Sequence, residues 1–97
     1  MLIVAGTGYV DPEHRDALLA DLAPALRAAR TTPGCLDYVV AADPIEPDRV
    51  NIYERWESQV HLDTHLAAVA QTAPPMTHVR GVEVVRYEIS SHSQLQG

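Results

Sequence analysis

The chain has 97 residues, of which 46% are hydrophobic and 21% are charged, which fits one compact globular domain. Its formal charge of −6 argues against binding to the phosphate backbone of nucleic acids, which clustered Lys and Arg side chains would engage. The sequence contains no Lys, which excludes a Schiff-base lysine and a phosphate-binding loop that depends on Lys.

The cysteine count and the N-terminal residues bear on cellular location. Cys35 is the only cysteine and cannot close an internal disulfide bond. The apolar run at residues 2–5 is too short for a secretory signal or a membrane span. We therefore expect a cytoplasmic protein that does not associate with membranes.

A strand followed by a helix is predicted at the start of the chain. Residues 2–10 are rich in β-branched residues, and at the next two positions Asp11 can cap a helix and Pro12 can occupy its first turn. Apolar residues then recur at helical spacing, at Leu18, Leu22, Leu26 and Ala29. Pro24 lies inside this pattern and removes one backbone hydrogen bond, so we expect a kink or break there.

A hairpin is predicted in the middle of the chain. Residues 33–34 (Pro-Gly) end the helix, residues 36–42 predict a second strand, and residues 50–56 predict a third. A polar, proline-rich turn at residues 43–48 joins the two strands. Alternation gives each strand two faces: Tyr38 and Val40 lie opposite Val39 and Ala41, and Val50, Ile52, Glu54 and Trp56 lie opposite Asn51, Tyr53 and Arg55.

A second helix and a last strand complete the pattern. Ser58 is a natural helix cap, and the apolar residues that follow it at helical spacing are Leu62, Leu66 and Val69. Residues 71–79, which include Pro74-Pro75, predict a connector, and residues 82–89 predict a strand. The polar tail at 91–97 has little to bury, which leaves residues 1–90 as the folded domain.

The order of these elements predicts an α+β fold of the ferredoxin-like βαββαβ type, a four-stranded antiparallel sheet with two helices on one face. If the uncovered face carries apolar side chains such as Tyr38 and Val40, it would pack on the sheet of a second copy and form a dimeric α/β barrel. A domain of this size buries only about 60% of the surface of its unfolded chain, so pairing would add apolar burial. We therefore expect a homodimer.

Three motifs carry a resemblance to a known family: Pro33-Gly34-Cys35-Leu36, Tyr53-Glu54-Arg55-Trp56-Glu57-Ser58, and His61-Leu62 followed by His65-Leu66. In their order and spacing the chain resembles the antibiotic biosynthesis monooxygenase family, and the stretch at 56–66 is similar to its bacterial quinol monooxygenases. The resemblance implies a dimeric ferredoxin-like fold. In characterised members it also implies oxidation of an electron-rich aromatic by molecular oxygen without flavin, heme or metal.

The chain departs from this family at two functional positions. Aromatic polyketide oxygenases of the family use an asparagine four residues before the motif tryptophan, where Ile52 stands here, and Asn51 points to the opposite strand face. Heme-degrading relatives carry their iron-ligating histidine ten residues after the tryptophan, where Leu66 stands. Heme degradation is therefore disfavoured, and we expect no cofactor.

Oxygenation without a cofactor requires a base, polar donors for the resulting anion, and a dry pocket. His65 is the best candidate base because an imidazole titrates near neutral pH, although it could also be a histidine that only packs in the core. Trp56 could supply an indole donor and a flat wall, although a lone tryptophan is more often core. Weaker substrate-binding candidates are Tyr38, Asn51, Tyr53 and Arg86.

Two further sequence patterns are weaker indications of a functional site. His61 and His65 have the spacing that lets two imidazoles bind one metal, but the glutamate of the zinc-protease motif is missing, so no metal site is expected. Residues 6–8 (Gly-Thr-Gly) lack the third glycine of a dinucleotide-binding loop and favour a bulge or a close backbone approach.

The leading hypothesis is a monooxygenase, an oxidoreductase acting on a small phenolic, quinol or polyketide-like aromatic, with His65 as base and Trp56 shaping the pocket. The first alternative is a non-catalytic module in which the same pocket holds a hydrophobic metabolite. The second alternative is an isomerase or lyase-like enzyme on the same dimeric fold.

Overall fold

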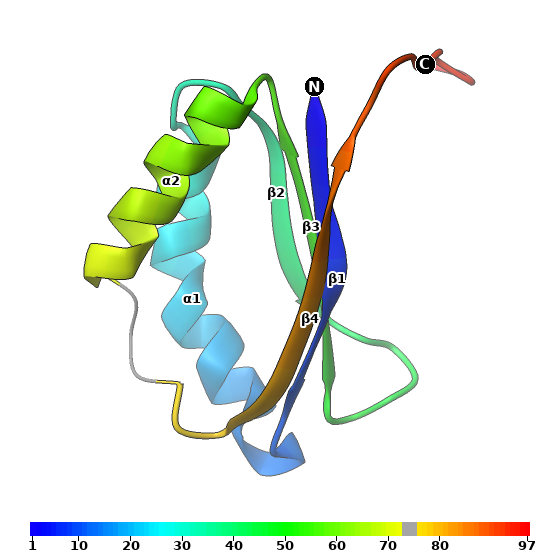
Figure 1. The fold of residues 1–97 in the computed structure, drawn as a ribbon. Coiled ribbons are helices and arrows are strands. Elements are labelled where there is room, and N and C mark those ends of the chain that lie inside the picture. The colour runs from blue at the N-terminus through cyan, green and yellow to red at the C-terminus, as the bar shows by residue number, and fades with distance from the viewer. Residues whose placement is uncertain (73–75) are drawn as a thin grey trace.

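The computed structural model describes residues 1–72 and 76–97. The described residues form, in order, β1 (Leu2–Val10), the 3-10 turn η1 (Pro12–His14), α1 (Arg15–Arg30), β2 (Cys35–Ala42), β3 (Arg49–Trp56), α2 (Gln59–Thr72) and β4 (Val79–Glu88). The strands make one antiparallel sheet in the order β2-β3-β1-β4, and both helices lie against the same face of it (Figure 1). The predicted ferredoxin-like fold is therefore confirmed.

Helix α1 differs from its prediction in two respects. It begins at Arg15, after the short 3-10 turn, and it runs without a break through Pro24. Pro24 and Ala20 are both exposed, so water can bind the Ala20 carbonyl that loses its backbone partner. The break expected at Pro24 is therefore absent.

The segments around β4 complete the chain. The proline pair of the predicted connector, Pro74-Pro75, lies outside the described residues. After β4, the Ile89 N–H donates to the Met1 carbonyl over 3.0 Å, and the rest of the tail is exposed. Within 1–72 and 76–97, no helix is long and apolar enough to cross a membrane.

The strand register determines which side chains face the helices. Trp56 pairs with Leu2 across β1 and β3, and Glu54 pairs with Tyr38 across β2 and β3. Since Trp56 packs with Leu62 of α2, the side chains in phase with it, including Tyr38 and Val40, also face the helices. The expectation that Tyr38 and Val40 lie on the uncovered face is wrong, because alternation defines two faces but not which of them the helices cover.

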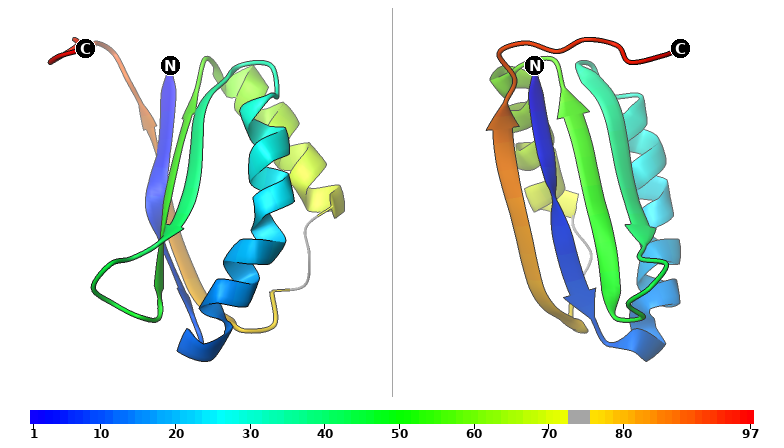
Figure 2. Two further views of the ribbon diagram at one scale, coloured as in Figure 1. Left: turned by 180° about the vertical axis from the view of Figure 1, so that it is seen from behind. Right: turned by 90° about the vertical axis from the view of Figure 1, so that its right-hand side faces the viewer.

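The uncovered face of the sheet is seen in the right-hand view of Figure 2, with both helices behind it. By alternation, its apolar side chains among the described residues are those of Ile3, Ala5, Tyr9, Val39, Ala41, Tyr53, Val85 and Tyr87. Val85 and Tyr87 are 46% and 50% exposed in the single chain. The apolar surface that could meet a second copy therefore consists of these residues.

The buried core is small and divided between the two ends of the sheet. Leu2, Trp56 and Leu62 form a cluster at one end, and Val10 and Val50 are buried toward the other. Between these ends, the apolar side chains of α2 and β4 that point inward remain partly exposed to an interior space. This space is the candidate site.

Candidate functional site

A cavity of about 530 Å³ lies between the sheet and the two helices. Its lining comes from both helices and all four strands and is predominantly apolar, for example Leu22 and Ala25 of α1, Leu66 and Val69 of α2, and Ile52 and Val84 of the sheet. The volume and the apolar lining are typical of a site for a small organic molecule.

Two glycines of β1 help to shape this region. Gly8 lines the cavity, and a Cβ placed there would lie 3.0 Å from Val50 Cγ2. At Gly6, a Cβ would lie 1.9 Å from the Glu83 carbonyl oxygen, so β4 can approach β1 closely only because Gly6 has no side chain. The close backbone approach predicted for residues 6–8 is confirmed.

The ionisable side chains of the described cavity lining gather at the end nearest Trp56. Glu54 reaches this end because it lies two residues before Trp56 on the same face of β3, and Tyr38 is its cross-strand partner. His65 comes from α2, with its ring centroid 4.7 Å from that of Trp56 and 5.2 Å from that of Tyr38. Its inward position follows from its place one turn after the buried Leu62.

Trp56 supports this end of the cavity from behind. Its side chain is fully buried, and it is not among the residues that line the cavity. Its indole Nε1 donates a hydrogen bond to Glu54 Oε1 over 3.0 Å. Burial raises the pKa of the Glu54 carboxyl, and the indole hydrogen bond opposes this rise. The expected direct contact between Trp56 and a ligand is therefore not supported by this geometry.

Glu54 was not selected from the sequence as a site residue. It is only 8% exposed, and it lines the cavity beside His65. The alternation of β3 already placed its side chain on the face of Trp56, which was the available clue. A carboxyl inside a strand is usually solvated, so only its burial identifies it as unusual.

His65 and Tyr38 are held in their neutral forms. Desolvation lowers the pKa of His65, which favours an uncharged imidazole at neutral pH. Burial, with a smaller contribution from the charge of Glu54, raises the pKa of Tyr38 to about 12, so its hydroxyl keeps its proton. Within the described part of the chain, neither side chain has a hydrogen-bond partner, so both can serve a bound molecule.

The other predicted substrate-binding residues do not reach the cavity. Asn51 lies on the uncovered face, where it accepts from Arg49 Nε and donates to Asp43 Oδ1, each over 2.8 Å. Tyr53 lies on the same face, and Arg86 bonds the Gln59 side chain beside α2. The cavity lining includes none of these three residues, because β3 turns successive side chains to opposite faces and Arg86 bonds a residue of α2, so their role in substrate binding stays a prediction.

The two histidines of α2 lie in separate surroundings. His61 Nδ1 is 2.7 Å from the Ser58 hydroxyl, and its ring lies over Gly34, where a Cβ would be 2.1 Å from His61 Cγ. His65 instead packs on Trp56 and Tyr38. Gly34 also has a φ of +83°, so the tight turn and the histidine both require glycine at this position.

Comparisons with known proteins agree with this architecture. The family model described as antibiotic biosynthesis monooxygenase matches residues 1–74. A candidate antibiotic biosynthesis monooxygenase from Deinococcus radiodurans is 27% identical, with a TM-score of 0.80 and complete coverage of both chains. Another from Chloroflexus aurantiacus is 31% identical, with a TM-score of 0.64 and coverage of 95% of this chain and 96% of that one.

Two further matches show how far the likeness extends. The heme-degrader MhuD of Mycobacterium tuberculosis shares the fold, with a TM-score of 0.73 at 16% identity and coverage of 97% of this chain and 100% of that one. An uncharacterised protein of Synechocystis is 28% identical over 64 residues, which are 66% of this chain and 44% of that protein. The chain thus matches less than half of the length of this curated relative.

Proposed function

The chain belongs to the antibiotic biosynthesis monooxygenase family, and we propose that it oxidises a small phenolic, quinol or polyketide-like aromatic with molecular oxygen. The observation that carries this proposal is the apolar cavity of about 530 Å³, with the His65 imidazole and the Tyr38 hydroxyl at one end, neither of them hydrogen-bonded to any residue in 1–72 or 76–97. The described lining contains no Arg, so an uncharged substrate fits better than an anion.

His65 is the base in this proposal. Its neutral imidazole takes a proton from an activated hydroxyl or methylene of the substrate, and the Tyr38 hydroxyl donates a hydrogen bond to the resulting oxyanion. The anion passes one electron to oxygen, and the two radicals combine into a peroxide. Loss of water then leaves a carbonyl, so that a methylene and O₂ give a ketone and H₂O.

Trp56 and Glu54 act as positioning residues. Trp56 is fully buried and does not line the cavity, and its ring backs His65 at a centroid distance of 4.7 Å. Its indole also holds the Glu54 carboxyl in place beside the cavity. Loss of the Trp56 ring would therefore disturb the position of His65 without removing a ligand contact.

Oxygen uptake by the purified protein across a panel of quinols and anthrones tests the proposal. For a substrate that is turned over, His65→Ala should lower kcat by about a hundred-fold or more, because the base is lost. His92→Ala, in the exposed tail, is the matched control and should leave kcat unchanged. Full turnover by His65→Ala would remove His65 from the mechanism.

The second candidate function is that of a non-catalytic binding module, favoured by the apolar side chain of Ile52 in the cavity lining. The same panel distinguishes the two, because a binding module would retain an aromatic ligand without consuming oxygen. An isomerase on this fold would instead form its product under anaerobic conditions.

We also propose that two copies pair through the uncovered face of the sheet. Its exposed Val85 and Tyr87 side chains offer apolar area that a second sheet could bury. On the same face, Arg55 Nε is buried and has no hydrogen-bond partner among the described residues. A stable monomer of 10.6 kDa by light scattering at micromolar concentration would contradict the pairing.

A further inference from the structure

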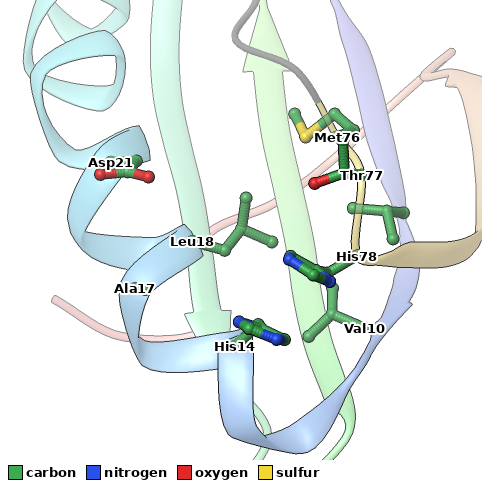
Figure 3. Close-up of a pocket in the computed structure, with 9 residues that line it drawn as sticks. Val10, His14, Ala17, Leu18, Asp21, Met76, Thr77 and His78 are labelled. Atoms are coloured by element: carbon green, nitrogen blue, oxygen red, sulfur yellow. The ribbon is translucent and has the colours of Figure 1, made fainter.

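A second polar cluster lies at the far end of β1 from Trp56. Asp11 follows β1, His14 ends η1, and His78 directly precedes β4. The potential ligand atoms of these three side chains all lie within 4.8 Å of one another. Figure 3 shows the rings of His14 and His78 facing each other beside Leu18 and Met76. We propose that Asp11, His14 and His78 bind a divalent transition-metal ion of the Zn²⁺ type.

The donor set decides the class of ion. Two imidazoles and one carboxylate suit Zn²⁺, Co²⁺ or Ni²⁺, whereas Ca²⁺ and Mg²⁺ prefer oxygen ligands alone. Asp11 Oδ2 already lies 3.3 Å from His78 Nδ1, so two of the three donors are adjacent. A water molecule would complete a four-coordinate shell.

The imidazoles must turn to receive the ion. Their ring centroids are 3.5 Å apart with an interplanar angle of 9°, and lone pairs in two parallel planes do not meet at one point. Zinc ligands stand about 3.3 Å apart, as follows from metal–ligand bonds of about 2.0 Å in a tetrahedron. The His78 side chain is 49% exposed, and a cavity of about 130 Å³ lies beside both rings, so this rotation has room.

The surrounding charges permit a cation. Arg80 is a cation paired with this cluster, with its Nε 3.5 Å from Asp11 Oδ1 and its Nη2 2.7 Å from Asp48 Oδ2. Two carboxylates thus balance one guanidinium, and Asp11 Oδ2 faces His78 instead of Arg80. A bound ion would link the segment before α1 to the start of β4.

Titration calorimetry of the untagged, chelator-treated protein with Zn²⁺ tests the site. We expect one ion per chain, with binding weakened at least ten-fold by His14→Ala, by His78→Ala and by Asp11→Asn. His61→Ala is the matched control and should bind as the wild type does. Binding that is absent in the wild type, or that survives the loss of both His14 and His78, would overturn the proposal.

Histidine side-chain NMR of the wild-type protein gives a second measurement that needs no variant. Among the five histidines, Zn²⁺ should shift the ring signals of His14 and His78 and leave His61 and His65 unchanged. Shifts confined to other histidines would refute the site. Because His65 lies at the opposite end of the sheet, either result is independent of the proposed oxygenation.

Discussion

Replacing Trp56 with phenylalanine tests whether the buried indole supports Glu54. Phenylalanine keeps an aromatic ring in a position that is fully buried but removes the N–H that donates to Glu54 Oε1 over 3.0 Å. A buried acceptor left without its donor costs about 1–3 kcal/mol of folding free energy. Trp56→Ala would remove the ring as well, at about 3–5 kcal/mol, and could unfold a domain whose total stability is about 5–15 kcal/mol.

The loss of folding free energy caused by Trp56→Phe should depend on pH. Burial raises the pKa of folded Glu54 above its ordinary value of 4.5, so its contribution to stability falls as pH rises from 4.5 through the folded pKa. The indole hydrogen bond lowers that pKa, so its loss should raise the pKa further and increase the penalty on the ionised carboxylate. The destabilisation by Trp56→Phe should therefore be larger at pH 7 than at pH 4.

Urea unfolding followed by circular dichroism at pH 4 and pH 7 measures this difference. The matched control is the same substitution in a Glu54→Gln background, where position 54 carries no titrating carboxyl. There the loss of folding free energy caused by Trp56→Phe should not change with pH. A cost for Trp56→Phe that is equal at both pH values, or larger at pH 4, would refute the proposed coupling between the indole and the carboxylate.

Three further predictions address the turn, the dimer and the base. Gly34→Ala should destabilise the fold by at least about 1–3 kcal/mol in thermal melting, because its φ is +83° and its Cβ would meet His61, whereas Gly81→Ala, with no atom within 4 Å, should be nearly neutral. Tyr87→Arg should convert a dimer to a monomer in light scattering, and an unchanged mass would exclude this face as the interface. Since burial lowers the pKa of His65 below 6.5, the midpoint of the fall in kcat/KM on the acid side of the pH profile should lie below pH 6.5.

The sequence by itself determined the element order and much of the site. Helical spacing and strand alternation predicted both helices and all four strands, with ends that differ by a few residues from the observed ones. His65 follows the apolar Leu62 by three residues, a spacing that turns its side chain toward the sheet, where it is 8% exposed. The motifs at residues 33–36 and 53–58 indicated the family, and the match over residues 1–74 confirms it. These features depend on spacing along one segment, which a sequence records directly.

Tertiary structure alone decided which face the helices cover and which distant residues meet. Alternation separates Tyr38 from Val39, but only the packing of Trp56 on Leu62 places Tyr38 inside the cavity. It also places the Trp56 ring behind His65 and Glu54, outside the cavity lining. His14 and His78 become neighbours only when β4 pairs with β1. Packing of the whole sheet determines which remote segments meet, and no periodic pattern in the sequence predicts such a contact.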